Sequence, residues 1–331
     1  MFTKRAMGAV VGLAAAALIL SGCASDGGGD SSGGSGGGDG DKPYVALVSK
    51  GFQHQFWQAV KSGAEQAADE FGVELTFEGP DTEADVDQQI QMLQTALDKS
   101  PAAIGFAALD SQAAGPLLQQ AKDSNIPVIA FDSGVDSDIP VTTAATDNTA
   151  AAAEAAKHMA DAIGNEGKVA LVVHDQTSVT GQERRDGFVD YMEKNEPNIE
   201  IVDIQYGGGD QAKSADLAKA IIAANPDLKG LYGSNEGSAI GVVQAVKELG
   251  IDPTKLVVVG FDSGKAQMDA IRDGQMLGAI TQNPVGIGYE TVKAAVEAID
   301  GKDLPKSIDT GYYWYDKDNI DDEKIAAVLY E

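Results

Sequence analysis

Two short segments of the sequence are nearly identical, and each ends in Phe-Asp-Ser-Gly: Val128–Gly134 and Val257–Gly264. Each places a carboxylate, Asp132 or Asp262, directly after an apolar run. An ionised carboxylate can accept hydrogen bonds from two neighbouring hydroxyl groups, and charge-assisted bonds of this kind are about twice as strong as neutral ones. An Asp at the junction between a strand and a helix can also serve only as a helix cap. Because the whole segment is repeated, we favour contact with a polar ligand.

The segments that position these aspartates alternate between apolar, β-rich runs and runs with helical periodicity. Continuous apolar runs are typical of parallel strands buried on both faces. The first half predicts strands at 44–49, 73–77, 102–106 and 127–131, with helices at 56–71, 83–98 and 113–124. The second half predicts a helix at 149–163, then strands at 169–173, 200–205, 230–232, 256–260 and 278–281, with helices between them. This order predicts an α/β fold of two Rossmann-like lobes, each with a parallel sheet.

The chain is expected to cross between the lobes three times. The predicted N-terminal lobe comprises residues 43–146 and 283–311, and the predicted C-terminal lobe comprises residues 147–282 and 312–331. Asn283-Pro284 supplies a cap and a first-turn proline for a helix that returns to the first lobe. In open parallel sheets, ligands bind beyond the carboxyl ends of the strands. Asp132 and Asp262 are therefore expected to face one site shared by the two lobes.

The N-terminus has the features of an export signal. Lys4 and Arg5 precede an apolar run that is too short to span a bilayer, and residues 1–22 are predicted to be a lipoprotein signal peptide. The run ends in Leu-Ser-Gly-Cys, which resembles the bacterial lipobox, and Cys23 is the single cysteine of the chain. We predict that Cys23 is lipidated and that residues 23–42, rich in Gly, Ser and Asp, form a tether.

Charge and composition exclude several classes of protein. The formal net charge of -27 argues against binding to nucleic acid, whose phosphates require a basic surface. His158 and His174 have no partner at metal-ligand spacing, so we expect no metal site and no cofactor. The acidic surface itself is typical of a soluble exported protein and indicates no ligand.

Six segments in order resemble the periplasmic-binding-protein family that includes the ribose- and galactose-binding proteins, and the resemblance covers essentially all of the chain after the tether. The matching segments are Val48-Ser49 with Phe56-Trp57, Ile126–Ile129 with Asp132, Arg184–Phe188, Asn235-Glu236, Val259–Asp262, and Gln282–Pro284. The resemblance implies the type I fold of this family, in which two lobes close on a small sugar or polyol. It also implies delivery of that ligand to the transmembrane permease subunits of an ABC importer.

The resemblance assigns a role to each matching side chain. Phe56 and Trp57 would place at least one ring against the apolar face of a sugar, while the other packs in the core. Arg184 would bind hydroxyl oxygens with its rigid guanidinium fork. Asn235 and Gln282 each offer a donor and an acceptor, as a hydroxyl requires, although Asn235 could instead cap the following helix.

Two departures from the ribose-binding pattern concern the ligand. Ser133 stands where that pattern has an arginine, and the loop Lys50–Gln55 is slightly longer and carries His54. We include Ser133 and His54 among the candidate ligand contacts. These changes argue against ribose itself.

Other functions remain to be compared with this one. A glycosidase would use Asp132 and Asp262 as its carboxylate pair, but no acid of the chain has an obviously apolar setting that would raise its pKa. A regulator of the lactose-repressor type shares the two-lobed core, but the export signal and the absent DNA-binding segment argue against it. A receptor for a signalling furanose or a nucleoside remains an alternative. We expect a monomeric binding protein rather than an enzyme, exported and lipid-anchored to the outer face of the cell membrane, or periplasmic where an outer membrane exists.

Overall fold

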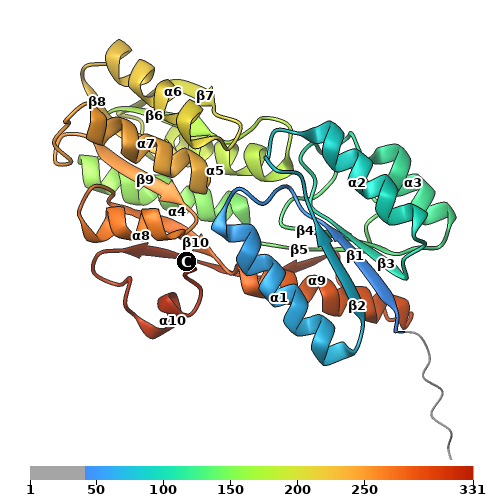
Figure 1. The fold of residues 1–331 in the computed structure, drawn as a ribbon. Coiled ribbons are helices and arrows are strands. Elements are labelled where there is room, and N and C mark those ends of the chain that lie inside the picture. Colours follow the sequence, from blue (N-terminus) through green and yellow to red (C-terminus); the bar gives the residue numbers. More distant parts are fainter. Residues whose placement is uncertain (1–41, 331) are drawn as a thin grey trace, which may run out of the picture. The chain divides into compact units, whose positions relative to one another are not determined.

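The computed structural model describes residues 42–330, whose strands form two six-stranded sheets (Figure 1). The first sheet has the order β11-β5-β4-β3-β1-β2 and the second has the order β12-β10-β9-β8-β6-β7. We call each sheet with its covering helices the first or the second lobe. The predicted signal peptide, Cys23 and nearly all of the predicted tether lie outside the described residues. Within residues 42–330, no helix combines the length and apolar character needed to cross a bilayer.

The sheet of the first lobe is parallel throughout and is buried on both faces. Its strands are β1 (Tyr44–Val48), β2 (Glu74–Glu78), β3 (Ala103–Phe106), β4 (Val128–Phe131), β5 (Thr142–Ala145) and β11 (Ser307–Asp309). One face packs against α1 (Gln55–Phe71) and α9 (Pro284–Ile299), and the other against α2 (Val86–Asp98) and α3 (Gly115–Asp123). Burial on both faces explains why β1, β3 and β4 are almost wholly apolar.

The second lobe repeats this plan with one antiparallel edge. Its strands are β6 (Gly167–Val173), β7 (Ile199–Tyr206), β8 (Leu228–Gly233), β9 (Val257–Phe261), β10 (Gly278–Gln282) and β12 (Tyr312–Asp316), of which β12 runs antiparallel to β10. The lobe's helices are α4 (Asn148–Ile163), α5 (Val179–Asn195), α6 (Gln211–Ala224), α7 (Glu236–Glu248), α8 (Lys265–Arg272) and α10 (Glu323–Ala326). They cover the sheet on both faces.

The predicted fold class is confirmed, since both lobes are α/β and nearly all strands are parallel. The chain passes between the sheets after β5, after β10 and after β11. Helix α9 thereby returns to the first sheet and lies beside α1 (Figure 1). The exact residues that divide the lobes stay a prediction.

Two glycines allow α1 and α9 to approach closely. A Cβ atom at Gly63 of α1 would lie 1.9 Å from the carbonyl oxygen of Val285, and one at Gly288 of α9 would lie 1.9 Å from that of Val60. Neither distance is possible for real atoms, so any side chain here would push the helices apart. This contact fixes α1, whose first turn reaches the carboxyl ends of the strands.

Several elements differ from the sequence prediction. Strands β5, β11 and β12 were not among the predicted strands, and β5 and β11 are short. Helix α2 begins at Val86 rather than at Glu83, because the Asp85 side chain caps it by accepting a hydrogen bond from the Gln88 amide at 2.9 Å. The later start leaves Glu83 in the preceding loop.

Candidate ligand-binding site

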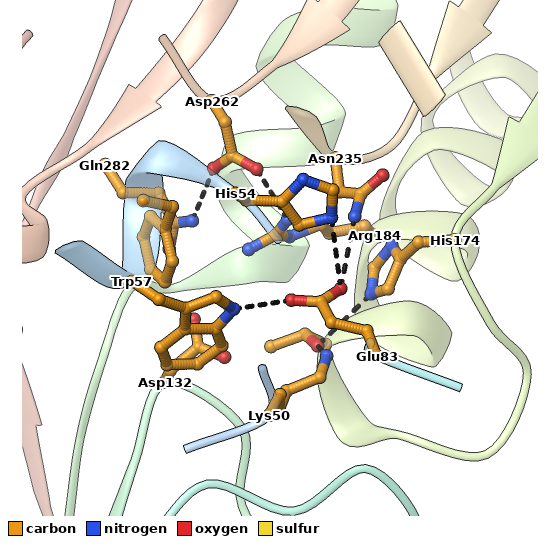
Figure 2. Close-up of a pocket in the computed structure, with 12 residues that line it drawn as sticks. Lys50, His54, Trp57, Glu83, Asp132, His174, Arg184, Asn235, Asp262 and Gln282 are labelled. Carbon is orange, nitrogen blue, oxygen red and sulfur yellow. Dashed lines mark hydrogen bonds and ion pairs between the residues drawn. The ribbon is translucent and has the colours of Figure 1, made fainter. Parts of the chain in front are cut away.

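A cavity lies between the two lobes at the carboxyl ends of their strands (Figure 2). The first lobe contributes six lining residues and the second lobe contributes six: Lys50, His54, Phe56, Trp57, Glu83 and Asp132, and His174, Thr180, Arg184, Asn235, Asp262 and Gln282. The space inside the cavity that no protein atom fills is about 270 Å³, counted out to open solvent, and only a small part of it is wide enough to admit a water molecule.

The two repeated aspartates take up the same unusual backbone conformation. Asp132 has φ of 56° and Asp262 has φ of 78°, in the left-handed region that non-glycine residues seldom adopt. Such a conformation costs roughly 1 kcal/mol or more, and it persists where the surroundings require it, often at functional sites. It turns the chain sharply after β4 and β9 and brings both carboxylates to the cavity.

Asp262 is held firmly by the second lobe. Its Oδ1 accepts a hydrogen bond from Gln282 Nε2 at 2.7 Å, and its Oδ2 accepts one from the Glu236 amide at 2.9 Å. Arg184 Nη1 lies 3.8 Å from Oδ2. The carboxylate is therefore fixed in orientation before any ligand is considered.

Asp132 is in the opposite situation. Its side chain is buried, yet its carboxylate accepts no hydrogen bond from any described residue. Burial raises the pKa of Asp132 to about 6, and the nearby Glu83 and Asp262 add to the rise, while Lys50 and Arg184 partly oppose it. A buried carboxylate without donors is costly, so this position is suited to donors from a ligand.

Arg184 is oriented by bonds to its own lobe. Its Nε donates to Asn148 Oδ1 at 2.8 Å, and its Nη1 donates to the Ser234 carbonyl oxygen at 3.0 Å. The guanidinium lies over the ring of Phe261, 3.8 Å from its centroid. Within the described residues Nη2 has no hydrogen-bond partner, and it is the donor left for a ligand.

Both aromatic residues line the cavity, and both also pack in the core. Phe56 and Trp57 are 4 % and 1 % exposed, and their rings meet edge to face at 4.9 Å. Trp57 Nε1 donates to Glu83 Oε1 at 2.6 Å. Each ring therefore both packs in the core and lines the cavity, so the two alternatives do not exclude each other.

The two amide side chains divide their groups between protein and cavity. Asn235 Oδ1 accepts from the Ser238 amide at 2.9 Å, which caps α7, and its Nδ2 donates to Glu83 Oε2 at 3.3 Å. Gln282 donates to Asp262, and its Oε1 is buried with no hydrogen-bond partner. Gln282 lines the cavity, and its Oε1 is therefore a second acceptor without a partner among the described residues.

Of the last two predicted ligand contacts, His54 lies at the cavity and Ser133 does not. His54 lines the cavity, with Nε2 placed 3.8 Å from Glu83 Oε2. Ser133 is not among the lining residues, since the sharp turn at Asp132 directs it away. Its Oγ accepts from the Thr180 amide at 3.4 Å, so the structure gives Ser133 a role in holding the lobes together.

Four lining residues were not predicted: Lys50, Glu83, His174 and Thr180. Lys50 Nζ donates to Thr180 Oγ1 at 3.1 Å. Burial lowers the pKa of His174 to about 3, so its imidazole is neutral, and its Nδ1 lies 2.7 Å from Ser234 Oγ. Lys50 and His174 directly follow predicted strands, and this position could have identified them in the sequence. Thr180 carried no such signal.

Glu83 is ionised at the centre of the group drawn in Figure 2. Burial alone would raise its pKa, but His54, Lys50 and the hydrogen bond from Trp57 outweigh burial and lower it. The cavity thus presents three carboxylates with amide, guanidinium and ammonium donors around them. Such alternating acceptors and donors match a molecule rich in hydroxyl groups. Within residues 42–330 no group of His, Cys, Asp or Glu is arranged to hold a metal ion.

Comparison with known proteins identifies the family to which the chain belongs. Residues 45–303 match the family described as periplasmic binding protein domain. The D-allose-binding periplasmic protein of Escherichia coli is 30 % identical over 269 residues, which are 78 % of this chain and 86 % of that protein. These relatives are binding proteins and not enzymes, which confirms the prediction on this point.

Solved structures show the same architecture. A carbohydrate-transporter solute-binding protein from Agrobacterium radiobacter, in complex with D-arabinose, is 31 % identical with a TM-score of 0.84, and the match covers 87 % of this chain and 99 % of that one. An ABC-transporter solute-binding protein from Agrobacterium vitis, bound to α-D-tagatopyranose, is 31 % identical with a TM-score of 0.84, covering 88 % and 100 %.

Proposed function

We propose that this chain, which belongs to the periplasmic binding protein family, captures a sugar or polyol between its lobes for an ABC importer. The observation that carries the proposal is the pair of open acceptors in the cavity, the Asp132 carboxylate and Gln282 Oε1. A ligand that donates to both would remove the cost of burying them unpaired. Hydroxyl groups placed on one ring can do so, and each can accept a bond as well.

The other lining groups narrow the class of ligand. Arg184 Nη2 can donate to a ring or hydroxyl oxygen, and the faces or edges of Phe56 and Trp57 offer apolar surface for C–H groups. The carboxylates of Glu83, Asp132 and Asp262 repel a negative group brought among them. We therefore propose an uncharged ligand of one ring or an open-chain polyol, rather than a sugar phosphate or a sugar acid.

The named ligands of the relatives support this class. The two structural neighbours hold D-arabinose and a tagatopyranose, and the Escherichia coli relative is named for D-allose. These sugars differ in carbon number and in hydroxyl orientation. We propose in addition that the chain is exported, anchored through Cys23, and delivers its ligand to the permease subunits of the importer.

A thermal-shift panel of pentoses, hexoses, polyols, nucleosides and autoinducer tests the proposal, followed by calorimetry on each compound that raises Tm. A ligand with a dissociation constant of 10 µM present at 1 mM raises the free energy of unfolding by about 2.7 kcal/mol. We expect this effect for at least one neutral sugar or polyol, and none for sugar phosphates. Selective binding of a nucleoside or a signalling furanose would instead establish a receptor, and no binding in any class would refute the proposal.

A further inference from the structure

Glu83 touches both lobes, although it belongs to the loop between β2 and α2 of the first. One carboxylate oxygen accepts from Trp57 Nε1 of the first lobe at 2.6 Å, and the other accepts from Asn235 Nδ2 of the second lobe at 3.3 Å. Figure 2 shows these bonds running in two directions from the one carboxylate. A single buried charge thus joins the aromatic wall of the cavity to the start of α7.

The turn after β7 lies directly against this contact. Gly209 has φ of 66°, and a Cβ atom there would lie 3.0 Å from Glu83 Oε2 and 3.2 Å from Asn235 Nδ2. Its carbonyl oxygen accepts a bond from Gln53 Nε2 of the first lobe at 3.3 Å. Gln53 Oε1 in turn accepts from the Glu83 amide at 3.1 Å. The turn of the second lobe therefore fits against the two loops of the first lobe.

We propose that Glu83 is a positioning residue that couples ligand capture to lobe closure, bridging Trp57 and Asn235 where Gly209 leaves room for the two lobes to meet. The inference rests on the proposed function, because it takes closure around a ligand as the event being coupled. Opening the cleft separates Asn235 and Gly209 from Glu83. Closure then restores the bond that holds Trp57 and the α7 cap in place at once.

The geometry also explains why a carboxylate stands at this position. Trp57 Nε1 and Asn235 Nδ2 are both donors, so the residue between them must accept twice. Glutamine has the same size but offers one acceptor and one donor, and its NH₂ would face one of the two donors. A charged acceptor in a buried site also strengthens both bonds.

Two glycines of the same turn provide a matched pair of variants. Gly209 and Gly208 both have positive φ, 66° and 70°, so alanine costs similar backbone strain at either position. A Cβ atom at Gly208 would meet nothing within 4 Å, whereas one at Gly209 would meet Glu83, Asn235 and Gln53. The difference between the two variants therefore measures the effect on the contact between the lobes, because the backbone strain is common to both.

We would measure the radius of gyration of both variants by small-angle scattering, with and without D-allose, D-arabinose and D-tagatose, and the affinity for each sugar. Gly209→Ala is expected to enlarge the radius and to weaken binding at least tenfold relative to Gly208→Ala. Equal radii and equal affinities for the two variants would overturn the inference. If no compound of the full panel binds the wild-type protein, the proposed function fails, and the radii alone still decide between the two variants.

Glu83→Gln tests the carboxylate itself, with circular dichroism to establish that the variant folds. We expect an enlarged radius for Glu83→Gln and recovery of the wild-type radius in the double variant Glu83→Gln, Asn235→Asp. In that pair the introduced glutamine accepts from Trp57 and donates to the introduced aspartate, which still caps α7. If Glu83 served only the fold of the first lobe, a change at Asn235 of the second lobe could not restore the radius. A radius that stays enlarged in the double variant would therefore contradict the inference.

Discussion

Replacing Asp132 by asparagine is expected to make the protein more stable and less able to bind. The carboxyl has a pKa of about 6 in the fold and an ordinary value of 3.8. This difference corresponds to about 3 kcal/mol between the ionised and protonated forms. Because the folded pKa is the higher one, the unfolded chain ionises first as the pH rises. The free energy of unfolding therefore falls between about pH 4 and pH 6 and stays lower above that range.

The asparagine side chain does not ionise, so the free energy of unfolding of the variant does not fall in this pH range. Relative to wild type, Asp132→Asn should gain up to about 3 kcal/mol at pH 7 but only about 1 kcal/mol at pH 4.5. Urea denaturation of the ligand-free protein at the two pH values measures both gains. Any constant effect of the amide cancels in their difference, and Asp69→Asn, at an exposed position of α1, serves as the control.

The binding side of the same prediction has the opposite sign. The variant loses a charged acceptor for ligand hydroxyls, so its affinity should fall at least tenfold, or about 1.4 kcal/mol. A buried charge that lowers stability while raising affinity is the expected trade-off at a functional site. The reasoning would be refuted by equal stability gains at pH 7 and pH 4.5, or by unchanged affinity in a variant that folds.

The other predictions concern the second aspartate, the helix contact and the anchor. Asp262→Ala should weaken sugar binding tenfold or more in calorimetry, and an unchanged dissociation constant would count against the site. Gly63→Ala forces a Cβ onto the Val285 carbonyl and should lower the free energy of unfolding by more than about 2 kcal/mol, whereas Gly115→Ala, which meets no atom within 4 Å, should change it little. Cys23→Ser should move the protein from the membrane fraction to the soluble fraction of the expressing cells, and an unchanged membrane fraction would contradict anchoring through Cys23.

Much of the fold could be predicted because its strands are buried on both faces. The runs that became β1, β3, β4 and β9 are apolar along nearly their whole length, which sets them apart from the amphipathic helices around them. Strand β5 is Thr-Thr-Ala-Ala and β11 has three residues, so neither has an apolar run. Their pairing follows from the neighbouring strand of the sheet rather than from their own composition.

The candidate site was predictable where a residue sits at a strand end or in a repeated segment. Asp132, Asp262 and Gln282 follow or end strands, and the sequence placed them at one edge of each sheet. Glu83 was missed because the predicted helix began there, and only the Asp85 cap shows that it lies in a loop. The contacts of Glu83 cross between lobes, and no local pattern encodes such a pairing.

The repeated Phe-Asp-Ser-Gly segments acquire different roles in the structure, although both aspartates share the left-handed backbone. Asp262 is satisfied by Gln282 and the start of α7, so it forms a fixed acceptor. Asp132 accepts a hydrogen bond from none of the described residues, so burying its charge lowers stability, and a ligand that donates to it would offset this cost. Both carboxylates should then contribute to binding. Asp262 defines where a ligand hydroxyl lies, and Asp132 gains more free energy when a ligand donates to it. The aspartate of the first lobe therefore contributes more to the free energy of closure around a ligand than the aspartate of the second lobe.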